Sequence, residues 1–252
     1  MTLLITGGAS GIGAETARRA AARGHKVAIN YRSRDTQANA VVAAIKEKGG
    51  TAIALPGDVS READITRLFD ESERALGPIT HLVNSAGIGL NSRVEDFDGA
   101  ALARLFAVNT VGLMLCCREG ARRMSTKRSG KGGVIVNVSS MAGTIGGRPG
   151  ASAYAASKAA VDSFTMGFAK EMAPEGIRAV SVRPGMVETE ITEKMLADRD
   201  VRAAIEATIA MGRIGQADEI ANAILWALSD EASFISGVTL DASGGGFVFW
   251  KR

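Results

Sequence analysis

Short apolar, β-branched runs alternate with longer segments of helical periodicity along the whole chain, and this alternation constrains the fold more than any other feature. The runs are of strand length and apolar at nearly every position, which is typical of strands buried on both faces. Such strands belong to a mostly parallel sheet covered by helices on each side, so we predict a doubly wound α/β fold. The predicted strands are Leu3–Thr6, Lys26–Tyr31, Ala52–Leu55, His81–Val83, Gly133–Val138, Ile177–Val182 and Val238–Leu240. The predicted helices are Ile12–Arg23, Thr36–Lys48, Glu62–Ala75, Ala100–Met124, Ala153–Met172 and Asp218–Leu228.

The chain shows no internal domain boundary. Its 252 residues are enough for one sizeable core, and neither a low-complexity linker nor a repeat of fixed period divides them. We therefore predict one domain over residues 1–252. The polar stretch 188–215 follows a strand and shows no strand pattern of its own. Above the carboxyl ends of the strands it would cover a ligand, and we interpret it as a substrate flap.

Charge and cysteine content exclude several classes of function. The net charge is only +3, and the cations that gather near residues 118–131 are interpreted as a solvated helix end, not a nucleic-acid site. The two cysteines, Cys116 and Cys117, are adjacent, so we expect no disulfide framework and a reducing compartment. The sequence shows neither a signal-peptide pattern nor a run near 18 apolar residues. We predict a cytoplasmic protein with no nucleic-acid or membrane partner.

A glycine-rich turn follows the first predicted strand and opens the first helix: Thr6-Gly7-Gly8-Ala9-Ser10-Gly11-Ile12-Gly13. Glycines at 7, 11 and 13 permit positive φ and let main-chain amides approach a pyrophosphate at the helix N-terminus. The spacing departs from GxGxxG, because Thr16 occupies the last position. A purely structural strand-to-helix turn is the alternative. We predict a dinucleotide site that includes Gly7, Ser10, Gly11, Ile12 and Gly13.

The end of the second strand indicates which dinucleotide is bound. An acid there would bind a ribose 2′-hydroxyl, but Tyr31, Arg32 and Ser33 come first and no acid precedes Asp35. The Arg32 guanidinium suits a 2′-phosphate, so NADP(H) is favoured. A solvated Arg32 is the alternative, and use of NAD stays open.

Tyr154 and Lys158 are four residues apart in a helical segment and so share one face. Lowering a phenol pKa from about 10 to about 7 requires about 4 kcal/mol, which an ammonium ~4 Å away supplies at an effective dielectric near 20. We therefore predict that Lys158 lowers the pKa of Tyr154 and makes it a general acid or base near neutral pH.

Several motifs together resemble the short-chain dehydrogenase/reductase family from end to end. They are Thr6–Gly13, Asn84-Ser85-Ala86-Gly87, Asn109, Asn137-Val138-Ser139-Ser140, Tyr154/Lys158, Pro184-Gly185 and Ser236–Gly245. The resemblance implies a single-domain Rossmann fold with a seven-stranded parallel sheet in the order 3-2-1-4-5-6-7. It also implies a catalytic set in which Tyr154 is the acid/base and Lys158 lowers its pKa and binds the nicotinamide ribose. Ser140 would polarise the carbonyl and Asn109 would support a water relay; Ser139 is the alternative to Ser140.

The same resemblance implies further cofactor contacts. Asp58 and Val59 match an adenine pocket, and Asn84, Ala86 and Gly87 match the loop after the fourth strand, where Ser85 replaces a commoner asparagine. Pro184, Gly185, Val187 and Thr189 match the turn that holds the nicotinamide. His25 and His81 lack metal-ligand spacing and are interpreted as surface or helix-terminal residues, and we expect no metal.

These observations predict an NADP(H)-dependent oxidoreductase that interconverts a carbonyl and a secondary alcohol, resembling the 3-oxoacyl-carrier-protein reductase and glucose dehydrogenase-like members of the family. The alternative is a dinucleotide-sensing module with vestigial catalysis. The substrate and the direction of reaction stay open. Family members are commonly homotetramers that pair the two long helices, so we expect a homotetramer. Ala155, Ala159, Val161, Phe164 and Phe168 suit either the core or that interface.

Overall fold

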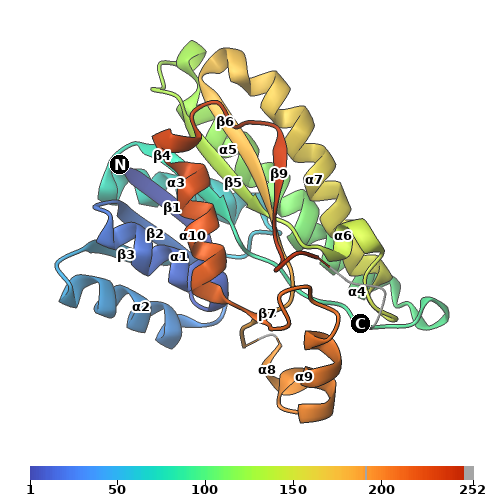
Figure 1. Cartoon of the computed structure of the whole chain (residues 1–252). Helices are drawn as coiled ribbons and strands as arrows, with labels where there is room; N and C mark the ends of the chain where they lie inside the picture. The colour runs from blue at the N-terminus through green and yellow to red at the C-terminus, as the bar shows by residue number, and fades with distance from the viewer. Residues whose placement is uncertain (191, 247–252) are drawn as a thin grey trace.

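Seven parallel strands form the central sheet of the computed structural model, which describes residues 1–190 and 192–246 (Figure 1). They are β1 (Thr2–Thr6), β2 (Lys26–Tyr31), β3 (Thr51–Pro56), β4 (Ile79–Asn84), β5 (Gly133–Val138), β6 (Ile177–Pro184) and β9 (Val238–Ala242). Their order is β3-β2-β1-β4-β5-β6-β9. The predicted order is confirmed, because β9 is the seventh strand of this sheet and two very short strands precede it in the chain.

Both faces of the sheet are buried, as the continuous apolar runs predict. Leu3 and Ile5 of β1 enter one core cluster and Leu4, between them, enters the other. The first face is covered by α1 (Gly11–Ala22), α2 (Asp35–Glu47) and α10 (Ala217–Leu228). The second is covered by α3 (Glu62–Leu76), α5 (Leu113–Met124) and α7 (Ser152–Met172). The doubly wound architecture follows from this two-sided burial.

The predicted helix Ala100–Met124 is not regular throughout. It consists of α4 (Gly99–Phe106), a π-helical turn η2 (Ala107–Gly112) and α5. A π-turn inserts a residue into the helical ladder and is often found at functional sites. The whole span is long and apolar enough to cross a membrane, but its inward face packs into the core through Leu105, Leu113 and Cys117. A core helix of a soluble protein passes the same test.

The stretch 188–215 has its own small core. It contains α8 (Glu193–Leu196) and α9 (Arg199–Glu206), which pack through Leu196, Ile205, Ile209 and Ile214. The prediction that it has no strand is wrong at its two ends, where β7 (Val187–Glu188) pairs with β8 (Gly215–Gln216). Figure 1 shows α8 and α9 beyond one end of the sheet, next to β7. The remaining elements are η1 (Val94–Asp96), η3 (Thr126–Arg128), α6 (Ala142–Ile145), η4 (Ala173–Glu175) and η5 (Asp230–Ala232).

The amino-terminal edge of the sheet holds the two histidines. His25 precedes β2 and His81 lies in β4, with their ring centroids 5.3 Å apart. The surface interpretation is wrong for His81, which is only 6% exposed. Burial, together with the nearby His25, lowers the pKa of His81 to about 4.

Candidate active site

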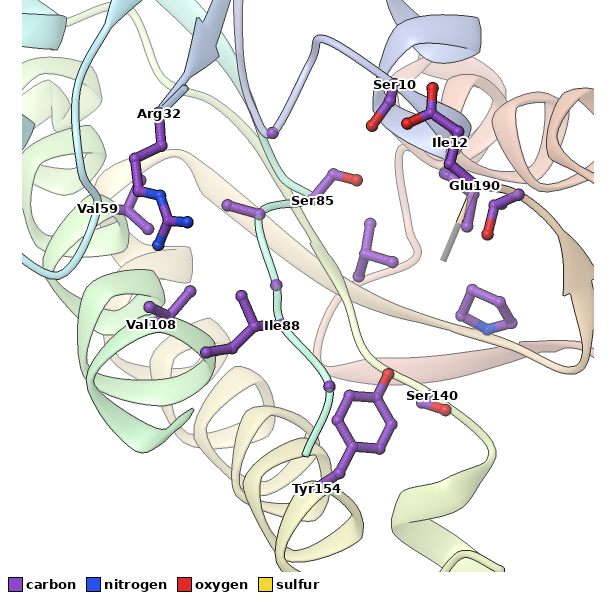
Figure 2. A pocket seen from close by; sticks show the side chains of 18 of the residues that line it. Ser10, Ile12, Arg32, Val59, Ser85, Ile88, Val108, Ser140, Tyr154 and Glu190 are labelled. Carbon is purple, nitrogen blue, oxygen red and sulfur yellow. The ribbon is translucent and has the colours of Figure 1, made fainter. Parts of the chain in front are cut away.

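A cavity of about 780 Å³ opens at the carboxyl ends of the strands, on the edge opposite to the histidines (Figure 2). Its size is that of a pocket for a cofactor with a small substrate. Most of the residues predicted for the site line it: Gly7, Ser10, Gly11, Ile12, Tyr31, Arg32, Ser33, Asp58, Val59, Ala86, Gly87, Ser140, Tyr154, Lys158, Pro184, Gly185, Val187 and Thr189. Gly13, Asn84 and Asn109 are not part of its lining.

Backbone atoms pack so closely around the glycine-rich turn that side chains at Gly7 and Gly13 would clash with them. The turn therefore presents main-chain amides and no side chains at these positions. Gly7 has φ of +67°, and a Cβ there would lie 2.8 Å from the Cα of Ala86. Gly13 does not have a positive φ. A Cβ at Gly13 would lie 2.4 Å from the carbonyl oxygen of Gly7, so its role is close packing of α1 against the turn. The space above the α1 N-terminus therefore fits a pyrophosphate.

Cations and a buried amide shape the end of the cavity where the sequence predicts the adenosine. In Figure 2, Arg32 lies beside Val59 at one end, far from Tyr154 and Ser140 at the other. Burial acts to raise the pKa of Asp58, but hydrogen bonds from Arg104 (2.8 Å) and Ser60 outweigh it and lower that pKa to about 2. Asn30 donates to the carbonyl of Gly57 at 2.9 Å and so joins the ends of β2 and β3. Asp58 is therefore a fixed anion on this wall.

Arg34 belongs to the site, although the sequence analysis assigned no role to it. Its guanidinium donates to the Ser10 hydroxyl at 2.8 Å and forms an ion pair with Glu190 at the start of the flap. All three side chains line the cavity. The signal that marked Arg32, a cation just after β2, applies equally to Arg34.

The opposite end of the cavity brings together Tyr154, Ser140 and Lys158, which the sequence predicts to be catalytic. Figure 2 shows Ser140, just after β5, close to the hydroxyl of Tyr154 on α7. Ser139 is 3% exposed and donates to the backbone carbonyl of Lys158 at 3.0 Å, so its hydroxyl is engaged in packing. The Lys158 ammonium donates to the Val138 carbonyl at 2.8 Å. Ser140 is thus the serine available to a ligand.

The predicted lowering of the Tyr154 pKa is wrong for the protein alone. Burial raises the pKa of Tyr154, and only the hydrogen bond with Ser140 opposes this. The Lys158 ammonium is 5.9 Å from the centre of the tyrosine ring. Burial also lowers the pKa of Lys158 to about 8. The prediction from helical spacing left out the cost of desolvation, which disfavours the charged form of both Tyr154 and Lys158. At neutral pH Tyr154 is a protonated phenol.

Asn109 lies outside the cavity lining and supports the wall of the cavity. Within the π-turn its side chain accepts from the Ile88 amide at 2.8 Å and donates to the Ile88 carbonyl at 2.9 Å and to the Ser157 hydroxyl at 3.1 Å. It is fully buried. These bonds fix the loop after β4 beside α7, so the side chain of Asn109 positions the wall of the cavity.

Asn84 points into the core. It donates to Asn137 at 2.9 Å and to the sulfur of Cys117 at 3.3 Å, and it links β4, β5 and α5 below the cavity. Asn137 in turn donates to Thr165 of α7 at 2.9 Å. This buried polar chain holds the central strands in register with the helix that carries Tyr154.

Comparison with known proteins shows similarity over nearly the whole chain. The family model described as enoyl-(acyl carrier protein) reductase matches residues 7–246. The uncharacterized oxidoreductase YgfF of Escherichia coli K12 is 40% identical over 247 residues, covering 96% of this chain and 98% of that protein. A 3-oxoacyl-[acyl-carrier-protein] reductase of Synechocystis is 35% identical, covering 98% and 96%. The structure of a mutant Serratia marcescens short-chain dehydrogenase/reductase has a TM-score of 0.90 at 30% identity, covering 97% and 96%.

Proposed function

The chain belongs to the short-chain dehydrogenase/reductase family of oxidoreductases, and we propose that it reduces a carbonyl to a secondary alcohol, and performs the reverse oxidation, with NADP(H). The observation that carries this proposal is the pair of hydroxyls, Ser140 and Tyr154, at one end of a cavity whose other end is lined by Arg32. The relative named as a 3-oxoacyl-[acyl-carrier-protein] reductase supports a carbonyl substrate.

The residues present fit a nicotinamide dinucleotide. The α1 N-terminus at Gly11 and Ile12 would hold its pyrophosphate, and Lys158 would hold the nicotinamide ribose. Asp58 and Val59 would border the adenine, while Pro184, Gly185, Val187 and Thr189 would border the nicotinamide. The bound cofactor would supply or accept the hydride.

The protein's own part is to bind and protonate the substrate oxygen. Ser140 and Tyr154 line the same end of the cavity, where both hydroxyls would donate to a carbonyl oxygen. Because burial raises the pKa of Tyr154, its proton is in place at neutral pH. The site is therefore ready for reduction, with Tyr154 as general acid. In oxidation Tyr154 must first lose its proton, and the Lys158 ammonium would stabilise the resulting phenolate.

Replacing Arg32 with aspartate is expected to raise the KM for NADPH about 30-fold while changing the KM for NADH much less. The substitution removes a charge-assisted hydrogen bond of roughly 2 kcal/mol and places a carboxylate beside a 2′-phosphate. Initial rates with each cofactor measure this. Arg128→Asp, which makes the same charge change on η3 at the amino-terminal edge, is the control. An unchanged NADPH KM in Arg32→Asp would place the phosphate contact elsewhere, with Arg34 the next candidate.

The function itself is tested by the loss of NADPH absorbance with a panel of ketones, aldehydes and quinones. Turnover with at least one of them is expected. Tight NADPH binding without turnover of any carbonyl, and without oxidation of any alcohol by NADP, would favour the dinucleotide-sensing alternative. The same screen would identify the substrate class, which the sequences of the flap and of the loop 143–152 leave open.

A cytoplasmic homotetramer completes the proposal. On α7, Ala155, Val161 and Phe168 are buried in the core and Phe164 is half-buried, whereas Ala159 faces outward. Its exposed neighbours at helical spacing are Ala156, Ser163, Met166 and Gly167. Small side chains allow close approach of a second helix, so this face suits pairing with another copy. Light scattering should give about four times the chain mass of 26.1 kDa; a monomer mass would contradict the assembly.

A further inference from the structure

Lys158 lies in a low-dielectric position that disfavours its charge. Its side chain is 5% exposed, and its ammonium has the uncharged Val138 carbonyl as hydrogen-bond partner. Burial lowers the pKa of Lys158 to about 8. A role that needs an ammonium therefore requires a compensating negative charge nearby.

Asp162 supplies a negative charge on the same face of α7, one helical turn after Lys158. Its side chain is only 13% exposed. The Ser181 hydroxyl of β6 donates to its Oδ1 at 2.6 Å, which fixes the carboxylate between helix and sheet. Ser181 pairs with Asn137 of β5, the residue before Val138, whose carbonyl binds the Lys158 ammonium. The carboxylate therefore lies near the ammonium, and its charge opposes the effect of burial on the lysine pKa.

A second layer of charge lies behind Asp162. Arg183 Nε of β6 is 3.7 Å from Asp162 Oδ2 and 2.9 Å from Asp241 Oδ1 of β9. Two carboxylates therefore share one guanidinium, and the Asp162–Arg183–Asp241 cluster keeps one net negative charge. Without Asp241, Arg183 would neutralise Asp162 and its field at Lys158 would largely cancel.

We propose that Asp162, supported by Arg183 and Asp241, is a positioning residue that keeps Lys158 protonated at the pH of catalysis. This inference rests on the proposed function, because it concerns the lysine assigned to the cofactor ribose and to Tyr154. It adds a part of the site that lies outside the cavity: none of the three residues lines it.

The other groups that face Lys158 and Asp162 carry no charge at neutral pH. From α7 Tyr154 faces the lysine, and Ser139 of β5 bonds to its backbone. The side chain of Asn109 in η2 and the Lys158 ammonium both lie near Gly87. Thr110 of η2 donates to the Ser157 carbonyl, and Ser181 of β6 binds Asp162. Among the described residues that surround the pair, the charges thus reside on Lys158, Asp162, Arg183 and Asp241.

Asp162→Asn is expected to move the alkaline limb of the pH profile of kcat/KM, and the titration of Lys158, to lower pH by about one unit. The Lys158 titration is followed by carbon-13 NMR of labelled lysine, with the signal assigned by its loss in Lys158→Met. Asp241→Asn is expected to give a smaller shift in the same direction. Asp162→Glu, which keeps the negative charge, is expected to leave the alkaline limb of the pH profile at the wild-type pH.

Ser181→Ala separates electrostatics from packing. It removes the hydrogen bond between β6 and Asp162 but keeps the carboxylate, so it is expected to lower Tm without moving the limb. An unchanged Lys158 titration in Asp162→Asn, or equal shifts in Asp162→Asn and Ser181→Ala, would overturn the inference. If the wild-type protein turns over no carbonyl or alcohol, the proposed function fails by itself, and the NMR titration still decides whether Asp162 holds the lysine charge.

Discussion

Replacing Tyr154 with phenylalanine should lower kcat for carbonyl reduction about a thousandfold and leave NADPH binding nearly unchanged. The substitution removes one oxygen atom, and with it the proton that the substrate oxygen must receive as hydride arrives. The phenyl ring keeps the shape of the half-buried tyrosine ring. A general acid typically contributes a hundredfold to ten-thousandfold, so the expected loss lies in the middle of that range.

The measurement pairs single-turnover NADPH oxidation with NADPH binding by fluorescence in the same preparation. Ser140→Ala is the matched variant, because it also deletes one hydroxyl from the site. Ser140→Ala should lower kcat less than Tyr154→Phe does, since Tyr154 still supplies the proton and only one hydrogen bond to the developing oxyanion is lost. Near-native turnover in Tyr154→Phe would rule out this residue as the acid, and a joint loss of binding and turnover would show that its hydroxyl mainly holds the cofactor.

The fold follows closely from sequence patterns because its determinants are local. The central strands are mostly apolar, and β1 shows why: Leu3 and Leu4 enter cores on opposite faces, so neither position tolerates a polar side chain. The glycine-rich turn is only partly local, since Gly13 is required by the carbonyl of Gly7, six residues earlier, whereas Gly7 is required by close contact with Ala86 in the loop after β4.

The parts of the site that sequence missed depend on residues brought together by the fold. Arg34 meets Ser10 and Glu190, which are 24 and 156 positions away in the chain. Arg104 meets Asp58 across 46 positions. Helical periodicity predicts one regular helix over Ala100–Met124 and therefore misses the π-turn around Asn109. The Tyr154 pKa was misjudged for a related reason: helical spacing gives proximity to Lys158, but burial depends on the whole domain.

Acidification from pH 7 to pH 4 should remove about 3 kcal/mol of folding stability through His81 alone. Its pKa falls from an ordinary value of 6.5 to about 4 in the folded protein, because burial and the positive charges of His25 and the N-terminus disfavour the imidazolium. Above pH 6.5 the ring is neutral in both states and stability is full. Between pH 6.5 and pH 4 the imidazole is protonated in the unfolded chain but neutral in the folded protein, so stability falls as the pH is lowered. Below pH 4 the imidazole is protonated in both states and the loss is complete.

Urea unfolding at pH 7 and pH 4.5 tests this directly, with His81→Gln as the variant. The glutamine can keep a polar contact with Thr80, whose hydroxyl lies 2.8 Å from His81 Nδ1. The variant should lose much less stability on acidification than the wild type, with a residual loss from His25, whose pKa is also lowered by burial. Asp58 does not add to this loss at pH 4.5. Its pKa is 3.8 in the unfolded chain and about 2 in the folded protein, so its contribution to stability is lost only below pH 3.8. Equal losses of stability on acidification in His81→Gln and wild type would show that the ring is hydrated or already charged at neutral pH.

Because the histidines lie at the sheet edge opposite to the cavity, NADPH should stabilise both proteins equally at pH 7.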